Sequence, residues 1–220
     1  MDDAGRIKER IIATARDRFL REGFARVLVD DIVEDLGISK KTFYKHFESK
    51  EELLRLIISQ AIAETYAHLR SILDGGDGFV IKLDRLMTFL GNQYARFGRT
   101  IMADCHRYLP ELWHEVQEFR RERIAREVKR LILEGMRGGF IRKDLNVELF
   151  LAAFTAGVDG VMAPAFLTTQ PISGREALNG IMGIFFQGIL TAPARTQLVR
   201  RRAKREHNPL HPSRITNSEF

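Results

Sequence analysis

Apolar residues recur at helical spacing along almost the whole chain of 220 residues. The pattern is clear at Ile7, Ile11, Ala15 and Phe19, because side chains four residues apart lie on one face of an α-helix. The sequence contains no run in which apolar and polar residues alternate, and no hairpin turn flanked by β-branched residues. The sequence therefore predicts an all-α protein.

The expected helices are separated by glycines, prolines and capping residues. Four helices precede the Gly-rich stretch 74–78, at about residues 7–22, 29–36, 39–47 and 50–73. Five more follow, at about residues 79–97, 100–107, 111–137, 146–166 and 174–191. We predict an N-terminal three-helix domain over 6–52 and a C-terminal helical domain over 53–192, joined by the long helix that starts at residue 50.

The formal charge of +6 is distributed unevenly. Residues 1–50 hold 11 basic and 10 acidic side chains, residues 51–190 hold 17 of each, and residues 191–220 hold 7 basic and 2 acidic. We interpret 193–220 as a basic, flexible tail, because it shows no helical pattern, and we suggest that it attracts phosphate without sequence preference. The total charge is therefore weak evidence for a basic binding domain.

The composition and the N-terminus also favour a cytoplasmic protein. A single cysteine, Cys105, excludes an internal disulfide framework and a multi-cysteine metal site, which fits a reducing compartment. We expect no secretory signal, because the N-terminus lacks an apolar segment. The apolar span 149–167 carries Asp159 at its centre and Pro164 near its end, so we interpret it as a helix buried in protein with no contact to a membrane.

Motifs of catalysis and of metal binding are missing from the sequence. It contains no P-loop, GxGxxG, HExxH, GxSxG or CxxC motif, and its six histidines show no ligand spacing. The neighbours Cys105 and His106 point about 100° apart on a helix and have no third partner. We expect no catalytic residue, no cofactor and no metal. An enzyme with its pocket in the helical module and a membrane-associated protein are the competing interpretations.

Residues 28–47 have the pattern of a helix-turn-helix motif: a helix of about two turns, a tight turn at 36–39 and a short second helix. On a helical wheel, Phe43 and Phe47 point inward from the second helix. The opposite face carries two cations flanked by a hydroxyl and a phenol, at Lys41, Lys45, Thr42 and Tyr44. Such groups suit phosphates and base edges in the major groove of double-stranded DNA.

Three further side chains extend this candidate DNA surface. Lys40 lies at the N-terminus of the short helix and Lys50 at the start of the next helix, where each can meet a phosphate. His46 lies on the flank and fits a phosphate contact as well as packing beside the long helix. From Gly37 to Lys50 there are four Lys and one Glu, a local charge of +3. Each side chain alone also fits an ordinary solvated face, and only their combination favours DNA.

These residues carry a resemblance to a known family. The shared pattern consists of Gly23-Phe24, Val29-Asp30-Asp31-Ile32, Leu36 to Phe47 and Ser49-Lys50-Glu51-Glu52-Leu53-Leu54. With these residues, the segment 11–57 resembles the DNA-binding domain of the TetR family of repressors. The resemblance implies a homodimeric, all-helical repressor that releases its operator, typically a palindrome, when a small molecule enters the C-terminal domain. It also implies that Thr42, Tyr44, His46 and Lys50 meet DNA.

One position departs from the family pattern. Where the family usually has Thr or Ser before the second helix, this chain has Val27-Leu28. The hydroxyl that would cap the helix and contact a phosphate is therefore absent. Asp30 and Asp31 still complement the helix dipole. We expect a weaker or shifted contact with the DNA backbone at this point.

The C-terminal domain offers candidates for a ligand pocket and for a dimer interface. Adaptable apolar groups with a few polar handles are typical of pockets, although they also fill ordinary cores. We select for an effector pocket Met87, Leu90, Tyr94, Met102, Cys105, His106 and Trp113. The last two helices are rich in small residues, which let the helices of two subunits approach closely, although they also suit a core within one subunit. We select for the dimer interface Ala153, Gly157, Gly160, Ile181, Ile184, Phe185 and Gly188.

Overall fold

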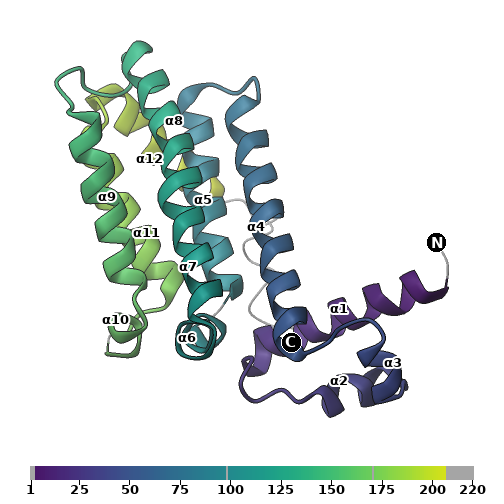
Figure 1. The fold of residues 1–220 in the computed structure, drawn as a ribbon. Helices are drawn as coiled ribbons and strands as arrows, with labels where there is room; N and C mark the ends of the chain where they lie inside the picture. The colour runs from purple at the N-terminus through teal and green to yellow at the C-terminus, as the bar shows by residue number, and fades with distance from the viewer. Residues whose placement is uncertain (1–2, 98, 170, 207–220) are drawn as a thin grey trace.

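The computed structural model describes residues 3–97, 99–169 and 171–206, and within these ranges it contains helices, turns and loops but no strand. The prediction of an all-α protein is thereby confirmed. An N-terminal unit is formed by α1 (Asp3–Glu22), α2 (Val29–Leu36), α3 (Lys40–Tyr44) and the first turns of α4 (Lys50–Asp74). Figure 1 shows that α4 continues from this unit into the second half of the molecule.

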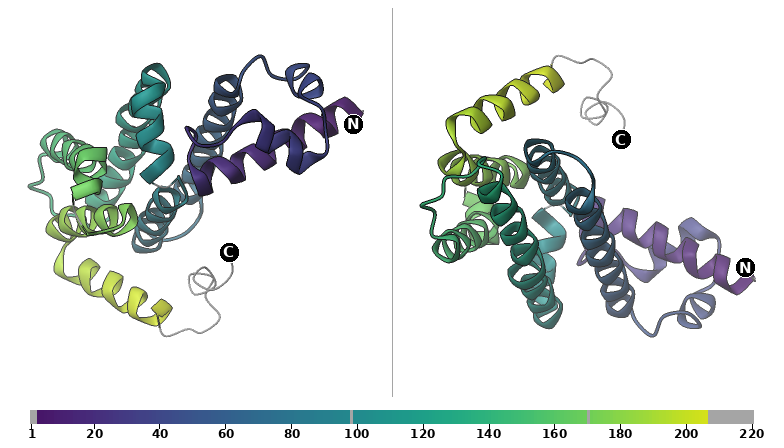
Figure 2. Two further views of the ribbon diagram at one scale, coloured as in Figure 1. Left: turned by 90° about the horizontal axis from the view of Figure 1, so that it is seen from below. Right: turned by 90° about the horizontal axis from the view of Figure 1, so that it is seen from above.

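The C-terminal bundle contains the rest of α4 and the remaining helices. These are α5 (Phe79–Phe97), α6 (Arg99–Tyr108), α7 (Pro110–Glu118), the π-helical segment η1 (Phe119–Ile124), α8 (Ala125–Arg137), α9 (Val147–Met162), α10 (Pro164–Thr169), α11 (Gly174–Ile189) and α12 (Ala192–Glu206). Helix α11 packs chiefly against α5 and α9. Both views of Figure 2 show α1–α3 projecting from one side of the bundle, with α12 on another side.

Two hydrophobic clusters correspond to the two halves. The N-terminal cluster is built around fully buried side chains such as Ile11, Phe19 and Phe43, and the C-terminal cluster around Leu83 and Phe186. The N-terminal cluster does not end with α4, because Cys105 of α6 and Leu112 of α7 are also buried in it. Helices α6 and α7 therefore join the bundle to the N-terminal unit.

The segment that was expected to be a non-helical tail begins with a helix. Ala194 and Leu198 are four residues apart on α12, and both are buried in the C-terminal cluster. Arg201 and Arg202 reach the buried carboxylate of Asp84 on α5, with N···O distances of 3.0 and 3.3 Å. The expectation of a flexible tail is thus wrong for residues 193–206, and residues 207–220 lie outside the described ranges.

Two of the expected helices are interrupted. The stretch 111–137 is not a single α-helix, because η1 inserts one π-helical segment between α7 and α8. The helix expected at 146–166 ends at Met162, where Ala163 adopts an extended backbone before Pro164. Proline disfavours the helical conformation of the residue before it, which explains this end.

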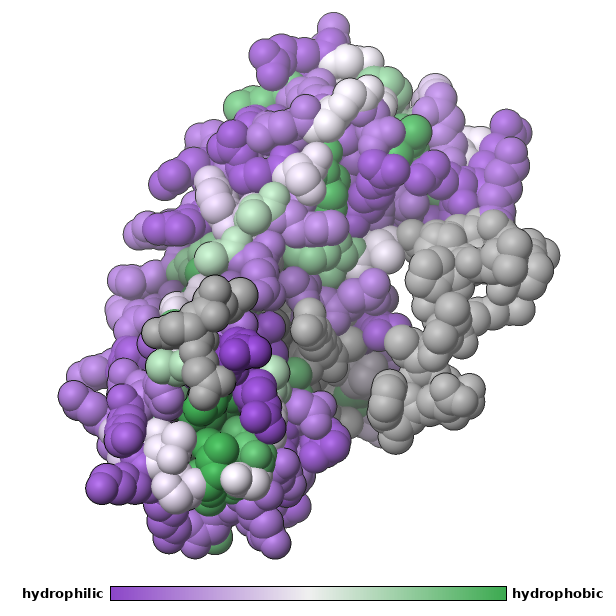
Figure 3. Space-filling model, turned by 90° about the vertical axis from the view of Figure 1, so that its right-hand side faces the viewer, coloured by the Kyte–Doolittle hydropathy of each residue, from purple (hydrophilic) through white to green (hydrophobic). Residues whose placement is uncertain are grey.

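The face of the N-terminal unit seen in Figure 3 is largely hydrophilic. Figure 3 shows this unit at the lower end of the molecule, with apolar side chains gathered in one small area. Leu28 and Tyr44 are among the large apolar side chains that remain exposed, at 58% and 52%. Among the described residues, no helix is long and apolar enough to cross a membrane.

Candidate nucleic-acid interface

The turn between α2 and α3 is set by one glycine. Gly37 ends α2 with φ of 63°, in the left-handed region that residues with a Cβ rarely adopt. The N–H of Gly37 donates to the carbonyl of Glu34 and the N–H of Ile38 to that of Val33, at 3.1 and 3.0 Å. These bonds satisfy carbonyls at the end of α2 and turn the chain directly into α3.

Helix α3 is short but well capped. The Ser39 hydroxyl oxygen accepts a hydrogen bond from the N–H of Thr42 at 3.1 Å and lies 3.0 Å from the Thr42 hydroxyl. Phe43 and Phe47 are buried in the N-terminal cluster, as the wheel predicted. Because a helix of five residues is unstable alone, these two anchors and the cap hold it in place.

The outer face of α3 is open to solvent. Lys41, Tyr44 and Lys45 are exposed, and within the described part of the chain neither lysine has a carboxylate within 4.0 Å. The Tyr44 ring meets the buried Phe43 ring edge to face, with centroids 5.3 Å apart, so the phenol is held pointing outward. The face therefore presents two uncompensated cations and a positioned hydroxyl.

Lys40 and His46 are less free to bind a ligand than the side chains of this face. The ammonium of Lys40 lies 2.7 Å from the Asp30 carboxylate of α2, and this hydrogen bond raises the pKa of the lysine. Both side chains are largely exposed, so the pair is weak and a phosphate can compete for the ammonium. His46 is half-buried beside Phe47.

Lys50 has a different environment from the one expected for a phosphate contact. Its ammonium donates to the carbonyls of Phe24 and Val27 at 2.9 and 2.7 Å and lies 4.2 Å from the centroid of the Phe24 ring. Burial lowers the pKa of Lys50. The lysine therefore ties the loop between α1 and α2 to the start of α4, because two of its three N–H groups are used by the protein itself.

The start of α2 has no side-chain cap, as the sequence predicted. Leu28 occupies the N-cap position, and the Asp31 carboxylate accepts a hydrogen bond from the Leu28 N–H at 2.7 Å. Asp31 thus supplies half of the usual reciprocal capping arrangement. Leu28 is exposed at this position and offers no hydroxyl.

Contacts from the bundle also position this unit, and local sequence patterns missed them. The Asp104 carboxylate of α6 accepts a hydrogen bond from the Ala25 N–H at 2.9 Å. Arg55 of α4 pairs with Glu115 of α7 at 2.6 Å. Because these partners are 79 and 60 residues apart, no spacing rule applied to one helix could have found them.

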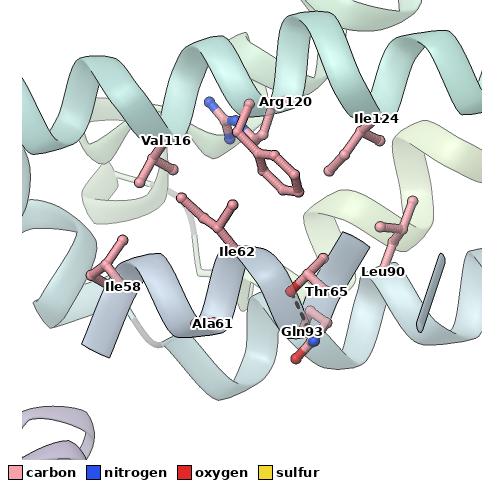
Figure 4. A pocket seen from close by; sticks show the side chains of 10 residues that line it. Ile58, Ala61, Ile62, Thr65, Leu90, Gln93, Val116, Arg120 and Ile124 are labelled. Carbon is pink, nitrogen blue, oxygen red and sulfur yellow. Dashed lines mark hydrogen bonds between the residues drawn. The ribbon is translucent and has the colours of Figure 1, made fainter. Parts of the chain in front are cut away.

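The bundle contains a cavity between α4, α5, α7 and η1, shown in Figure 4. Its volume is about 80 Å³. The wall is mainly apolar and consists of Ile58, Ala61, Ile62, Thr65, Leu90, Gln93, Val116, Phe119, Arg120 and Ile124. Its polar groups are Arg120 and the Thr65–Gln93 pair, in which the amide donates to the hydroxyl at 3.1 Å.

Of the predicted effector-pocket residues whose side chains the structure describes, only Leu90 lines this cavity. Met87 is buried in the C-terminal cluster, Cys105 and Trp113 pack in the N-terminal cluster, and His106 is exposed. The side chains of Tyr94 and Met102 lie outside the described part of the structure. The prediction chose aromatic and sulfur-containing residues, whereas the wall is formed mostly by aliphatic residues of α4 and by η1.

Helices α9 and α11 share an open apolar face. Ile184 is 72% exposed, and a Cβ added to Gly160 or Gly188 would meet no atom within 4 Å. Ala153 is also exposed. Gly157 instead packs against Ile181 and Phe185 inside the subunit, since a Cβ there would lie 3.2–3.3 Å from them. Four of the seven residues predicted for the dimer interface therefore lie on the open face, and the other three pack against one another within the subunit.

The fold and the site define a helix-turn-helix protein, and comparisons with known proteins agree. The sequence profile of "Bacterial regulatory proteins, tetR family" matches residues 11–57. The uncharacterized HTH-type transcriptional regulator YvaF of Bacillus subtilis (strain 168) is 25% identical over 182 residues, which cover 82% of this chain and 94% of YvaF. The HTH-type transcriptional repressor DhaR of Mycobacterium sp. (strain GP1) is 25% identical over 193 residues, which cover 84% of this chain and 92% of DhaR.

The fold is also found among solved structures. A transcriptional regulator from Cytophaga hutchinsonii superimposes with a TM-score of 0.69 and 20% identity, covering 85% of this chain and all of the other. Residues 11–57 therefore form a DNA-binding domain of the TetR family of bacterial transcriptional regulators. The protein is a DNA-binding regulator and not an enzyme.

Proposed function

We propose that this protein is a homodimeric repressor that binds a palindromic operator in the cytoplasm and releases it when a small molecule enters the bundle. The observation that carries the DNA-binding part is the exposed face of α3, where Lys41, Tyr44 and Lys45 point outward from buried Phe43 and Phe47. Lys40, Thr42 and His46 flank this face. Lys50 contributes indirectly, because its ammonium binds two carbonyls of the loop between α1 and α2.

Dimerisation follows from the size of the reading element and from the open apolar face. A single helix of five residues reads few bases, and two copies are needed to span half-sites about one turn of DNA apart. The exposed face of α9 and α11, with Ala153, Gly160, Ile184 and Gly188, suits a four-helix contact between two subunits. Gly157, Ile181 and Phe185 support that face from within the subunit.

Effector control is supported by the position of the cavity. Ile58, Ala61 and Ile62 belong to α4, the helix whose first turns hold the N-terminal unit. A ligand that moves α4 would change the position of α3, because the first turns of α4 belong to the N-terminal unit. The Arg55–Glu115 pair joins α4 to α7, and Asp104 of α6 binds the loop between α1 and α2. The relative DhaR is a transcriptional repressor, which favours repression here.

The test is a gel-shift titration with the DNA that flanks the gene. We expect Lys41→Ala to weaken operator binding several-fold and to reduce the salt dependence of log K by about 1, because one phosphate contact is lost. Tyr44→Phe removes one hydroxyl and should cost about 1 kcal/mol, or roughly fivefold. Lys143→Ala, an exposed lysine of the bundle, is the matched control.

Size-exclusion chromatography of the same variants should show an unchanged dimer. If both α3 variants bind the operator as tightly as the unmodified protein, the role proposed for this face is wrong.

A further inference from the structure

A second, smaller cavity of about 40 Å³ lies beside the first and shares three wall residues with it, Leu90, Arg120 and Ile124. Its remaining wall includes Phe154, Val158 and Asp159 of α9. Both cavities are small against the roughly 300–1,000 Å³ of typical ligand pockets. A ligand of ordinary size therefore has to occupy both, and it must displace the side chains that divide them.

The polar part of this dividing wall is an ion pair. Arg120 donates from Nη2 to Asp159 Oδ1 at 3.0 Å, and both side chains are largely buried, at 11% and 20% exposure. The other carboxylate oxygen of Asp159 is held by Arg121, whose Nε and Nη2 both lie 3.0 Å from Oδ2. Arg121 is 59% exposed and does not line either cavity.

This arrangement favours an anion over a cation or a neutral polar group. Two guanidinium groups share one carboxylate, so these three side chains together carry a charge of +1. If a ligand carboxylate takes the place of Asp159 on Arg120, Asp159 keeps its bonds to Arg121, and no buried charge is left without a partner. A cationic ligand would have to draw Asp159 away from both arginines.

The segment that carries Arg120 is unusual as well. Phe119, Arg120 and Ile124 all belong to η1, and all three line the first cavity. Single π-helical turns inside α-helices occur frequently at functional sites, because they change the direction of the side chains around them. The apolar wall opposite, from Ile58 to Ile62 on α4, suits an aliphatic body (Figure 4).

We propose that the effector is an amphipathic carboxylate, with an aliphatic body in the first cavity and its carboxylate on Arg120 in place of Asp159. This inference rests on the proposed function, since it names the chemical class that the effector site takes. Binding would break the contact between Arg120 of η1 and Asp159 of α9. The exchange involves no covalent step.

The one tryptophan of the chain reports on this exchange. The Arg120 guanidinium lies 5.9 Å from the centroid of the Trp113 ring, so movement of Arg120 changes the surroundings of the indole. Tryptophan fluorescence and isothermal titration calorimetry can therefore follow binding independently of DNA. Three probes with the same chain and different head groups separate the alternatives: octanoate, 1-octanol and octylammonium.

We expect the full-length protein to bind octanoate about tenfold or more tightly than either other probe, with a change in Trp113 fluorescence. Arg120→Gln should abolish this preference while 1-octanol still binds, and Arg120→Lys should keep part of it. Arg123→Gln removes a charge from the same π-helical segment but does not touch a cavity, and it should keep the preference in full.

Equal affinity for octanoate and 1-octanol would overturn the inference, as would a preference that survives Arg120→Gln. Failure of octanoate to bind would also overturn it. Gel shifts of the same preparation, without any probe, separate this failure from that of the proposed function. If the protein still binds the operator, only the inference about the effector fails. If operator binding is also absent, the proposed function fails as well.

Discussion

In the N-terminal unit the side chains proposed to contact DNA come from one stretch of seven residues, 40–46, whereas the wall of the cavity in the bundle comes from four elements spread over residues 58–124. The outward face of α3 follows from local caps and from two phenylalanines that occupy one side of a short helix. The cavity exists only where separate helices leave a space between them. This difference explains why the outward face of α3 agrees with the helical wheel, whereas the described cavity wall shares only Leu90 with the pocket predicted from sequence.

The largest expected effect comes from removing an anchor of α3. Phe43→Ala deletes a fully buried ring and should destabilise the N-terminal unit by about 3–5 kcal/mol. Because α3 depends on this ring, operator binding should be lost while the dimer persists. Leu83→Ala, at an equally buried position in the bundle, should cost about 2–5 kcal/mol.

Urea titrations followed by circular dichroism would measure both variants. If the two halves are as distinct as their clusters indicate, Phe43→Ala should produce a separate early transition. A single transition at the same lower urea concentration for both variants would show that α6 and α7 couple the halves into one cooperative unit.

The next effect concerns the cysteine at the junction of the halves. Burial raises the pKa of the Cys105 thiol to about 11, from an ordinary value of 9.0. At pH 8 this lowers the thiolate fraction by roughly 100-fold, so Ellman's reagent should react at least that much more slowly with the native protein than with the unfolded chain.

The raised pKa of Cys105 also makes the stability of the folded protein depend on pH. The folded state holds the proton more tightly than the unfolded state, so the contribution of this group to stability is complete below pH 9 and is lost as the pH rises from 9 to 11. Asp104→Asn weakens the bond to Ala25 and should speed up labelling if this contact closes the junction. An unchanged labelling rate would show that packing alone protects the thiol.

We expect a smaller loss of stability when the charge of Asp84, in the bundle, is removed. Asp84 is buried and holds Arg201 and Arg202, which are 38% and 29% exposed. Asp84→Asn should lower the free energy of unfolding by about 2 kcal/mol, less than for a fully buried pair, because water already screens both arginines. Hydrogen exchange should show faster opening of α12, with α3 unaffected. Protection of α12 equal to that of the unmodified protein would contradict this role.

Much of the fold could be predicted because its signals are local. Gly37, Ser39 and Ser49 end or cap helices through their own backbone and hydroxyl groups, so the end of α2 and the starts of α3 and α4 agree with the prediction. Helix α3 nevertheless ends at Tyr44, three residues before the predicted end. Helix α12 was missed because, among its described side chains, only Ala194 and Leu198 are buried, and they lie in a strongly basic segment. Its arginines bind Asp84, which lies more than 100 residues away in the sequence.

In the candidate DNA site, too, some side chains are placed by local sequence and others by tertiary contacts. The orientation of Lys41 and Tyr44 follows from helical geometry once Phe43 is buried. Lys50 has the charge and the helix position of a phosphate ligand, yet its ammonium binds the carbonyls of Phe24 and Val27. The direction of a long flexible side chain depends on what lies within its reach, and that is a property of the packed structure.

By itself, the sequence determined the helical class, the helix-turn-helix motif and the outward face of α3, because helix periodicity and caps act over a few residues. Only the tertiary structure decided which residues line the cavity, that Arg120 and Arg121 share Asp159, and that α12 packs on α5. These features depend on contacts between distant segments, whose geometry is set when the helices pack and not by the spacing within any one of them.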